Sequence, residues 1–545
     1  MDPHLVDHEL PSEIARRRTF AIISHPDAGK TTLTEKMLLY GGAIHLAGAV
    51  KSRKAQRHAT ADWMELEKQR GISVTSSVLQ FEYAGYAINL LDTPGHQDFS
   101  EDTYRTLMAV DSVVMLIDAA NGVEEQTRKL FEVCSRRGLP IFTFINKMDR
   151  YGRPPLDLLA EIEEVLGIRS TPINWPIGMG SDFKGVYDRV HRRCELYQHI
   201  GHGEKRVPMI SIEPEDDALR EVLGKEAHDT LVEEISLLDV AGDPLDLDRV
   251  NKGDLTPVFF GSALNNFGVQ SFFDHYLGMA PPPLGRKIED GVWVEPTDSE
   301  FSAFVFKIQA NLNPAHRDRI AFIRIVSGNF ERGMNAYHVR SQRQIRLSQP
   351  QQFLAQERSL IEEAYPGDIV GLFDAGVFQI GDTLTEGSTM RFVGIPHFSP
   401  ERFVTVRLKD AMKRKQLVKG LAQLSQEGAI QLFRPAGWGA TDTIVGAVGA
   451  LQFDVMHYRL KHEYGVDAHL EPAPYQVARW VQGDVDPKLL ESRDSVSVFD
   501  RFGRLAVLFT SEWALRWAER NYPDLRFEDT ASIIGEEAEW IAAMR

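Results

Sequence analysis

The segment from residue 24 to residue 32 has the composition of a phosphate-binding loop. It lies between an apolar run and an amphipathic stretch, and it consists of Ser24, His25, Pro26, Asp27, Ala28, Gly29, Lys30, Thr31 and Thr32. A loop that leads into a helix points backbone N–H groups at phosphate oxygens, and Gly29 lets the backbone approach them. Lys30 can neutralise the β- and γ-phosphates, and the Thr31 hydroxyl can bind the Mg2+ that bridges them. Because Ser24 stands where the usual pattern has glycine, an ordinary turn remains the alternative.

A second polar turn follows an apolar run that ends at Asp92. It consists of Asp92, Thr93, Pro94, Gly95 and His96. Asp92 at a strand end can reach the Mg2+ shell, and the Gly95 N–H can contact the γ-phosphate of a bound nucleotide. Taken alone, the same residues also fit a tight Pro-Gly turn with an incidental acid.

The base-recognition signal comes from Asn146, Lys147, Met148 and Asp149, at the end of another apolar run. The Asp149 carboxylate can accept hydrogen bonds from guanine N1–H and the 2-amino group, whereas adenine has neither donor. An adenine facing this carboxylate would lose roughly 3 kcal/mol of binding free energy, which favours guanine by at least about a hundredfold. Asn146 can tie this segment to the phosphate loop while the Lys147 stem lies along the base. Ser262 and Ala263 are placed for backbone contacts to the guanine oxygen, so the four signals together predict a GTP/GDP site.

Hydrolysis requires a group that aligns water and a segment that senses the γ-phosphate. His96 is the candidate for the first role, with a structural surface histidine as the alternative. Ser73, in Arg70–Ser73, can complete the Mg2+ shell when GTP is bound, so the predicted metal ligands are Thr31, Ser73 and Asp92. We identify no arginine finger in the chain, which predicts slow unaided hydrolysis and a stimulating partner.

The order of apolar and amphipathic segments predicts a parallel sheet covered by helices in the first part of the chain. The expected strands are 19–24, 78–83, 87–92, 113–118, 141–145 and 257–260, and the expected helices are 30–40, 124–137, 156–166 and 269–277. An irregular, acidic insertion of undefined function interrupts this pattern at residues 171–253.

Two further regions follow. Short runs at 301–308, 319–326, 369–373 and 378–380 predict a β-barrel, and alternation at 403–408, 412–426, 443–448, 451–464 and 466–470 predicts a C-terminal α/β domain. The expected domains are therefore 1–284, 285–395 and 396–545. After Trp480 we expect only a short ending.

The overall composition limits the class of protein. The chain has 545 residues, a net charge of −17 and two cysteines, Cys134 and Cys194, without metal-site spacing. We expect a cytoplasmic, multidomain protein without disulfides, membrane segments or nonspecific DNA binding. Two basic clusters have two possible interpretations, as local RNA contacts or as solvated surface. They are Lys51, Arg53, Lys54 and Arg57, and Arg407, Lys409, Lys413, Arg414, Lys415 and Lys419.

Several of these segments resemble those of translational GTPases. Residues 58–72 and Asp92–His96 are similar to elongation factor G and its relatives. A second set of segments resembles the bacterial class II peptide chain release factors. It consists of residues 24–32, 70–73, 175–180, 304–310, 364–368 and 445–453. The resemblance runs from about Thr19 to Trp480. Ser73 departs from the threonine of the wider family but agrees with this subfamily.

This resemblance implies a P-loop GTPase domain, a translation-factor β-barrel and a ferredoxin-like C-terminal α/β domain. It implies a monomer that binds the ribosome after peptide release and drives class I release factors off it. His96 would be activated by large-subunit RNA and proteins, and the basic clusters would contact rRNA. The alternatives are a translocase of the elongation factor G type, which the length disfavours, and a GTP-loaded binding module that hardly hydrolyses its nucleotide.

Overall fold

The computed structural model describes residues 10–42, 76–197, 209–214, 216–310, 319–354, 357–393, 395–436 and 443–532. The chain forms two compact units. The first holds the residues up to His96, with Ala109–Leu284 and Phe353–Ser359, and the second holds Gln97–Met108, Gly285–Gln352 and Leu360–Arg545. Three expectations lie outside the described residues: Ser73, the Arg70–Ser73 segment and the basic cluster at residues 51–57.

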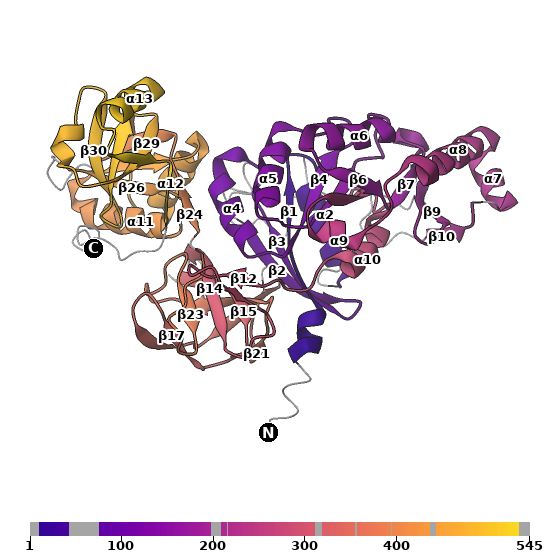
Figure 1. The fold of residues 1–545 in the computed structure, drawn as a ribbon, viewed down its shortest axis with the longest axis horizontal. Coiled ribbons are helices and arrows are strands. Elements are labelled where there is room, and N and C mark those ends of the chain that lie inside the picture. Colours follow the sequence, from indigo (N-terminus) through magenta and orange to yellow (C-terminus); the bar gives the residue numbers. More distant parts are fainter. Residues whose placement is uncertain are drawn as a thin grey trace. The chain divides into compact units, whose positions relative to one another are not determined.

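The first unit is built on a seven-stranded sheet in the order β2-β3-β1-β4-β5-β11-β6 (Figure 1). The strands are β1 (Arg17–Ser24), β2 (Ser77–Tyr83), β3 (Tyr86–Asp92), β4 (Ser112–Asp118), β5 (Ile141–Asn146), β6 (Arg169–Pro172) and β11 (Leu255–Phe260). The pairs are parallel except for the β2–β3 hairpin. This arrangement confirms the predicted parallel sheet. It also brings the carboxyl ends of β1, β3, β4, β5 and β11 to one edge.

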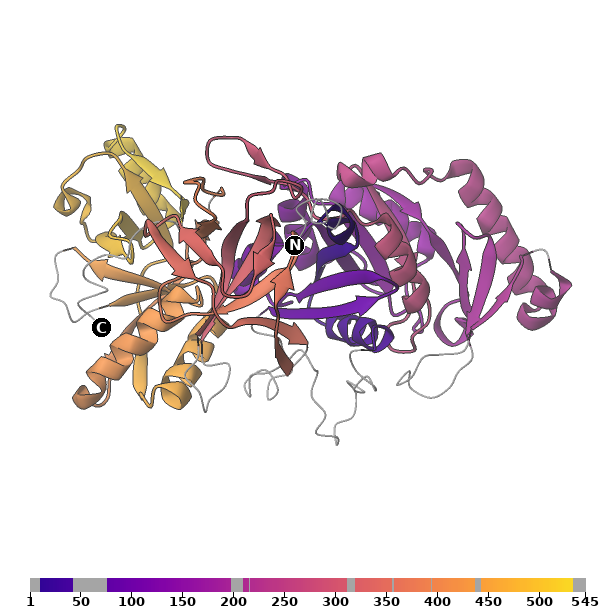
Figure 2. The ribbon, with the colours of Figure 1, turned by 90° about the horizontal axis from the view of Figure 1, so that it is seen from below.

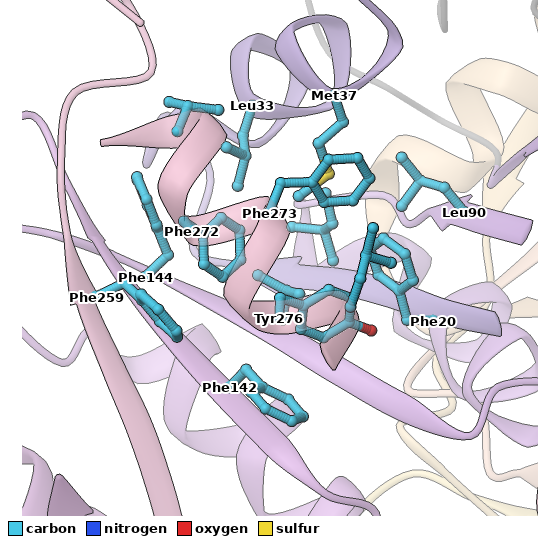
Figure 3. Packing of buried hydrophobic residues seen from close by; sticks show 14 of the residues in the cluster. Phe20, Leu33, Met37, Leu90, Phe142, Phe144, Phe259, Phe272, Phe273 and Tyr276 are labelled. Atoms are coloured by element: carbon cyan, nitrogen blue, oxygen red, sulfur yellow. The ribbon is translucent and has the colours of Figure 1, made fainter. Parts of the chain in front are cut away.

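Helices pack on this sheet through a core rich in aromatic rings. The helices are α2 (Lys30–Tyr40), α5 (Glu125–Arg136), α6 (Pro155–Glu161) and α10 (Val269–Met279). Phe272, Phe273 and Tyr276 of α10 project toward the rings of the sheet (Figure 3). The helix expected at 156–166 changes to a π-helix at Ile162–Leu166.

The described residues of the acidic insertion form a subdomain of strands and helices. It has a four-stranded antiparallel sheet of β7 (Asn174–Ile177), β8 (Gly185–Asp188), β9 (Arg193–Tyr197) and β10 (Met209–Ile212), with helices α7 (Asp217–Leu223), α8 (Lys225–Ala241) and α9 (Leu247–Asn251). Helix α8 lies beside this sheet in both views (Figures 1 and 2). Trp175 Nε1 on β7 donates to Glu234 Oε2 on α8 at 2.7 Å, which ties the helix to the sheet.

The β-barrel region of the second unit contains six neighbouring strands in the order β18-β17-β23-β14-β15-β22. They are β14 (Ser302–Ala310), β15 (Arg319–Ser327), β17 (Asn335–His338), β18 (Arg343–Arg346), β22 (Ile369–Phe373) and β23 (Thr383–Thr385). The strand predicted at 378–380 is wrong. The Asp374 carboxylate accepts from the N–H of Gly376, Val377 and Phe378, so the chain turns there and the strand begins at Thr383.

The C-terminal region begins with β25 (Arg402–Leu408), α11 (Arg414–Gln426), β26 (Gln431–Pro435), β27 (Ile444–Ala447), α12 (Ala450–Glu463) and β28 (Ala468–Pro472). The sheet order β28-β25-β27-β26 gives this βαββαβ unit the predicted ferredoxin-like topology. The short ending expected after Trp480 is wrong. Strand β26 pairs with β30, and β30 (Ser495–Asp500), β31 (Leu505–Phe509), β29 (Val477–Gln482) and β32 (Arg526–Glu528) continue the sheet with α13 (Glu512–Asn521) beside it.

A segment from the first fifth of the sequence belongs to the second unit. It comprises the 3-10 turn η1 (Gln97–Phe99) and α4 (Ser100–Met108). Asp98 Oδ2 accepts from the Leu451 N–H of α12 at 2.8 Å, and Arg105 Nη2 donates to the Gly428 carbonyl at 3.0 Å. A Cβ at Gly449 would lie 2.0 Å from Asp98 Cγ, so only glycine allows this approach. None of the helices described is long and apolar enough to cross a membrane.

Candidate nucleotide-binding site

The predicted phosphate loop connects β1 to α2 at the carboxyl edge of the sheet. Ser24 is the last residue of β1, and Gly29 is the residue before α2, with a left-handed φ of 103°. A Cβ at Gly29 would lie 2.3 Å from Asn146 Nδ2, so a side chain is excluded on steric grounds as well. Since glycine has no side chain to cap the helix, the first N–H groups of α2 remain suited to an anion.

Lys30 and Asp92 form a buried ion pair next to this loop. Lys30 Nζ lies 2.5 Å from Asp92 Oδ1, and the two residues are 6% and 2% exposed. The pair joins the start of α2 to the end of β3. Removing either partner alone would leave an uncompensated buried charge. If Lys30 and Asp92 separate, each therefore needs a new partner of opposite charge.

The turn after Asp92 lies against the phosphate loop. Thr93 Oγ1 donates to the Ile22 carbonyl of β1 at 2.7 Å. A Cβ built at Gly95 would lie 3.5 Å from Pro26 Cα, which places the backbone of this turn beside the loop. His96 follows it and is partly exposed.

Asn146, the last residue of β5, bridges two loops. Its Nδ2 donates to the Ala28 carbonyl at 2.8 Å, and its Oδ1 accepts from the Ala263 N–H at 2.9 Å. Both partners and Asn146 itself are at most 2% exposed. One amide side chain therefore links the phosphate loop to the loop after β11. The sequence predicted the contact with the phosphate loop.

Lys147 forms a second bridge to the phosphate loop. Its Nζ donates to the Asp27 carbonyl and to Asp118 Oδ2, both at 2.6 Å. Lys147 and Asp27 both have left-handed backbones, with φ of 70° and 66°, which non-glycine residues adopt where surrounding contacts enforce it. Sequence reasoning missed Asp118, although its position as an acid ending the apolar β4 was a usable signal.

Asp149 is oriented by a neighbour from the loop after β11. Ser262 Oγ donates to Asp149 Oδ1 at 2.6 Å, so one carboxylate oxygen is held while the other can face a ligand. The backbone N–H of Ser262 donates to Phe267 O and that of Ala263 to Asn146 Oδ1. The expected contacts of these N–H groups with guanine would share or replace those bonds. The Ser262 side chain instead has an orienting position that the sequence did not reveal.

The remaining predicted residues complete the loop. Thr31 and Thr32 lie in the first turn of α2 and are partly exposed. The His25 N–H donates to Thr127 Oγ1 of α5 at 3.1 Å, which fixes the front of the loop. Met148 is fully buried, and its N–H donates to the Gly261 carbonyl.

Two sequence-level features lie away from this edge. Cys134 and Cys194 are buried and form no disulfide. In the second basic cluster, Arg407 pairs with Glu471 at 3.1 Å and Lys409 with Asp467 at 2.9 Å. These pairs partly neutralise the cluster, while Arg414, Lys415 and Lys419 of α11 are exposed.

Comparison with known proteins covers the chain in three segments. Residues 15–282 match the elongation factor Tu GTP binding domain, residues 300–387 match elongation factor G domain 2, and residues 392–519 match the class II release factor RF3 C-terminal domain. A crystal structure of a protein from Thermus thermophilus shares the fold, with a TM-score of 0.67 and 23% identity over 89% of this chain and 72% of that chain. Fold and site together define a P-loop GTPase of the translation-factor class that binds guanine nucleotide.

Relatives along almost the whole chain narrow the class further. Peptide chain release factor 3 of Symbiobacterium thermophilum is 61% identical over 96% of this chain and 99% of its own length. The proteins of that name from Acaryochloris marina and Gloeobacter violaceus are 52% and 53% identical over 97% and 96% of this chain, and over 98% and 99% of their own. The chain belongs to the peptide chain release factor 3 family. It is a GTP-dependent release factor of translation termination, not a translocase of the elongation factor G type.

Proposed function

We propose that GTP binds along the carboxyl edge of the β1–β11 sheet and that each predicted residue has a separate role there. The backbone N–H groups of residues 27–32 and the Lys30 ammonium bind the phosphates, and Asp149 recognises guanine N1–H and the 2-amino group. The observation that supports this most is the pair of bridges from Asn146 and Lys147 to the phosphate loop. They hold the base-reading and phosphate-binding segments at a fixed separation.

The Lys30–Asp92 pair indicates how a Mg2+–nucleotide complex would be accommodated. Asp92 is a buried carboxylate that already holds a cation at 2.5 Å. Its oxygen and the Thr31 hydroxyl would belong to the all-oxygen donor set that Mg2+ prefers, and we propose the hydroxyl of Ser73, which lies outside the described residues, as a third ligand. When bound, the ion supplies charge neutralisation at the β- and γ-phosphates. We propose that Lys30 then turns from Asp92 to the phosphates, so both buried charges stay compensated.

For hydrolysis we propose that His96 positions the attacking water. It follows Gly95, whose backbone lies beside Pro26 of the phosphate loop. No arginine finger for this role was identified in the sequence. We therefore propose that large-subunit RNA and proteins of the ribosome complete the site, which would make hydrolysis dependent on the ribosome.

The family supports a cycle in which the protein, as a monomer in the cytoplasm, binds the ribosome after peptide release and promotes dissociation of class I release factors. The experiment loads post-termination ribosomes with a fluorescently labelled class I factor. Its dissociation is then followed with the protein and GTP, with GDP, or with a non-hydrolysable analogue. We expect faster dissociation with GTP than without the protein.

A matched variant separates the ribosomal function from nucleotide binding. The Asp149→Asn protein should accelerate dissociation of the class I factor with XTP but not with GTP, because an amide donates where the carboxylate accepts. Equal dissociation rates with and without the wild-type protein and GTP would reject the recycling function, even if nucleotide binding were intact.

A further inference from the structure

Three side chains with metal-binding atoms meet in the first unit, away from the nucleotide residues. Asp188 ends β8, His191 lies in the turn between β8 and β9, and His275 is on α10. One ligand atom from each residue lies within 4.8 Å of the other two. The cluster brings together the insertion and α10, a helix that packs on the GTPase sheet.

Asp188 is the centre of the cluster and is fixed in place. Its Oδ1 accepts from the N–H groups of Val190 at 2.9 Å and His191 at 3.0 Å. Its Oδ2 lies 2.7 Å from His191 Nδ1 and 2.9 Å from His275 Nε2. Its two oxygens thus take part in four hydrogen bonds, two with backbone N–H groups and two with imidazole nitrogens, which hold the buried carboxylate in one orientation.

The two imidazoles approach the same carboxylate oxygen from different elements. Their ring centroids are 5.0 Å apart. The His275 side chain is 10% exposed and packs near Phe259, whereas the His191 side chain is 54% exposed. A cation between them would meet one rigid histidine, one adjustable histidine and a fixed carboxylate, with one side open to water.

We propose that Asp188, His191 and His275 bind a divalent transition-metal ion, with Zn2+ as the representative, and that water supplies a fourth ligand. Two imidazole nitrogens and one carboxylate oxygen suit Zn2+ and neighbouring ions, whereas Mg2+ and Ca2+ favour oxygen alone. Tetrahedral bonds of about 2.0–2.1 Å place ligand atoms about 3.3 Å apart. The separation of 2.7 Å between Asp188 Oδ2 and His191 Nδ1 would reach that spacing through a small outward rotation of the exposed His191. The separation of 2.9 Å between Asp188 Oδ2 and His275 Nε2 would have to widen by about 0.4 Å through a small shift of the His275 ring.

Proton balance permits this exchange. In the metal-free cluster each histidine donates an N–H to Asp188 Oδ2. On metal binding His191 coordinates through Nδ1 and His275 through Nε2, so each neutral ring carries its proton on the other nitrogen. A ring that starts as an imidazolium releases one proton to solvent.

The ion would act as a cross-link between segments distant in sequence. It would join the β8–β9 turn to α10, the helix that follows the Ser262–Ala263 loop. A clip that closes a long stretch of chain stabilises the folded state by restricting the unfolded one. The insertion would thereby be held on the GTPase sheet without any change to the nucleotide-binding residues.

The test compares Zn2+ binding by the full-length protein without an affinity tag, free of nucleotide, with that of His191→Ala. Binding is measured by equilibrium dialysis, by competition with a zinc dye and by the visible absorption of Co2+ as a substitute. The matched control is His457→Ala, which removes a 43%-exposed histidine that faces the single carboxylate of Asp467 at 3.8 Å.

We expect wild type and His457→Ala to bind one more equivalent of Zn2+ than His191→Ala. We also expect Zn2+ to raise the Tm of the first two proteins but not of the third. Because His191 is 54% exposed, its variant should still fold, and without metal its Tm should fall only by the loss of the hydrogen bond to Asp188, which checks folding independently. Equal zinc stoichiometry in wild type and His191→Ala, or the same loss in His457→Ala, would overturn the proposal.

Discussion

Replacement of Asn146 by alanine tests whether the two loops of the nucleotide site are held in position by one side chain. The variant removes the hydrogen bonds to the Ala28 carbonyl at 2.8 Å and from the Ala263 N–H at 2.9 Å. Both backbone groups belong to residues at most 2% exposed. They would remain unsatisfied if the loops kept their present positions, because alanine supplies neither donor nor acceptor.

The size of the effect follows from the two orphaned groups. Each buried, unsatisfied group costs about 1–3 kcal/mol, so the pair costs about 2–6 kcal/mol. If the loops stay in place, the whole cost lowers the free energy of unfolding and leaves affinity unchanged. If the loops separate in the free variant, nucleotide must reorder them, and the cost lowers affinity. We expect the second outcome, with a rise in Kd of at least about 30-fold for GDP and GTP, since about 2 kcal/mol corresponds to that factor.

The assay is titration with a fluorescent guanine nucleotide, together with thermal unfolding of the nucleotide-free protein. The matched control is Asn89→Ala in β3, which removes an equally buried asparagine that contacts Gln80 and Thr19 inside the sheet. This control should lower Tm while leaving nucleotide affinity within about threefold of wild type. An Asn146→Ala protein with that same behaviour would refute the reasoning and make Asn146 a purely structural residue.

Three further predictions concern separate parts of the chain. His96→Ala should keep GTP affinity but lose most ribosome-stimulated hydrolysis, and unchanged turnover on ribosomes would contradict its role. Asp149→Asn should shift preference from GTP toward XTP in competition binding, whereas retained GTP selection would remove Asp149 from base recognition. Burial raises the pKa of Cys134 to about 12, above the unfolded value of about 8.5. The stability from its buried neutral thiol is complete below pH 8.5 and falls by about 2 kcal/mol by pH 10. In urea unfolding, the stability advantage of wild type over Cys134→Ala should shrink over that interval, and a constant difference would contradict the assignment.

The sequence predicted the site edge because each chemical signal directly follows a buried apolar strand. Asp92, Asn146 and Ser262 follow runs that form β3, β5 and β11, and the carboxyl ends of parallel strands meet at one edge. As an acid that ends an apolar run, Asp118 could have been assigned to this edge, but its contact with Lys147 could not have been predicted from the residues around it. It depends on β4 lying next to β5, in a register that sets Asp118 opposite Asn146 and brings its carboxylate to Lys147.

Errors in the predicted fold have local or long-range physical causes. Apolar Phe378 and Ile380 suggested a strand, but the Asp374 and Asp382 carboxylates bind the N–H groups of this segment and hold it in turns. The region after Trp480 was underestimated because its short strands gain stability by extending a sheet through β26. That pairing joins residues far apart in sequence, and no local period reports it.

The assignment of Gln97–Met108 to the second unit has a consequence for how such a protein can be divided. A fragment that ends at Leu284 would carry α4 without its partners in the C-terminal region. The guanidinium of Arg105, which is 3% exposed, would lose the Gly428 carbonyl, and Asp98 would lose the Leu451 N–H. The stretch of sequence up to Leu284 therefore encodes one helix, α4, whose packing partners lie in the C-terminal region. Recombination that exchanged the C-terminal region alone would have to preserve a matching surface on α4.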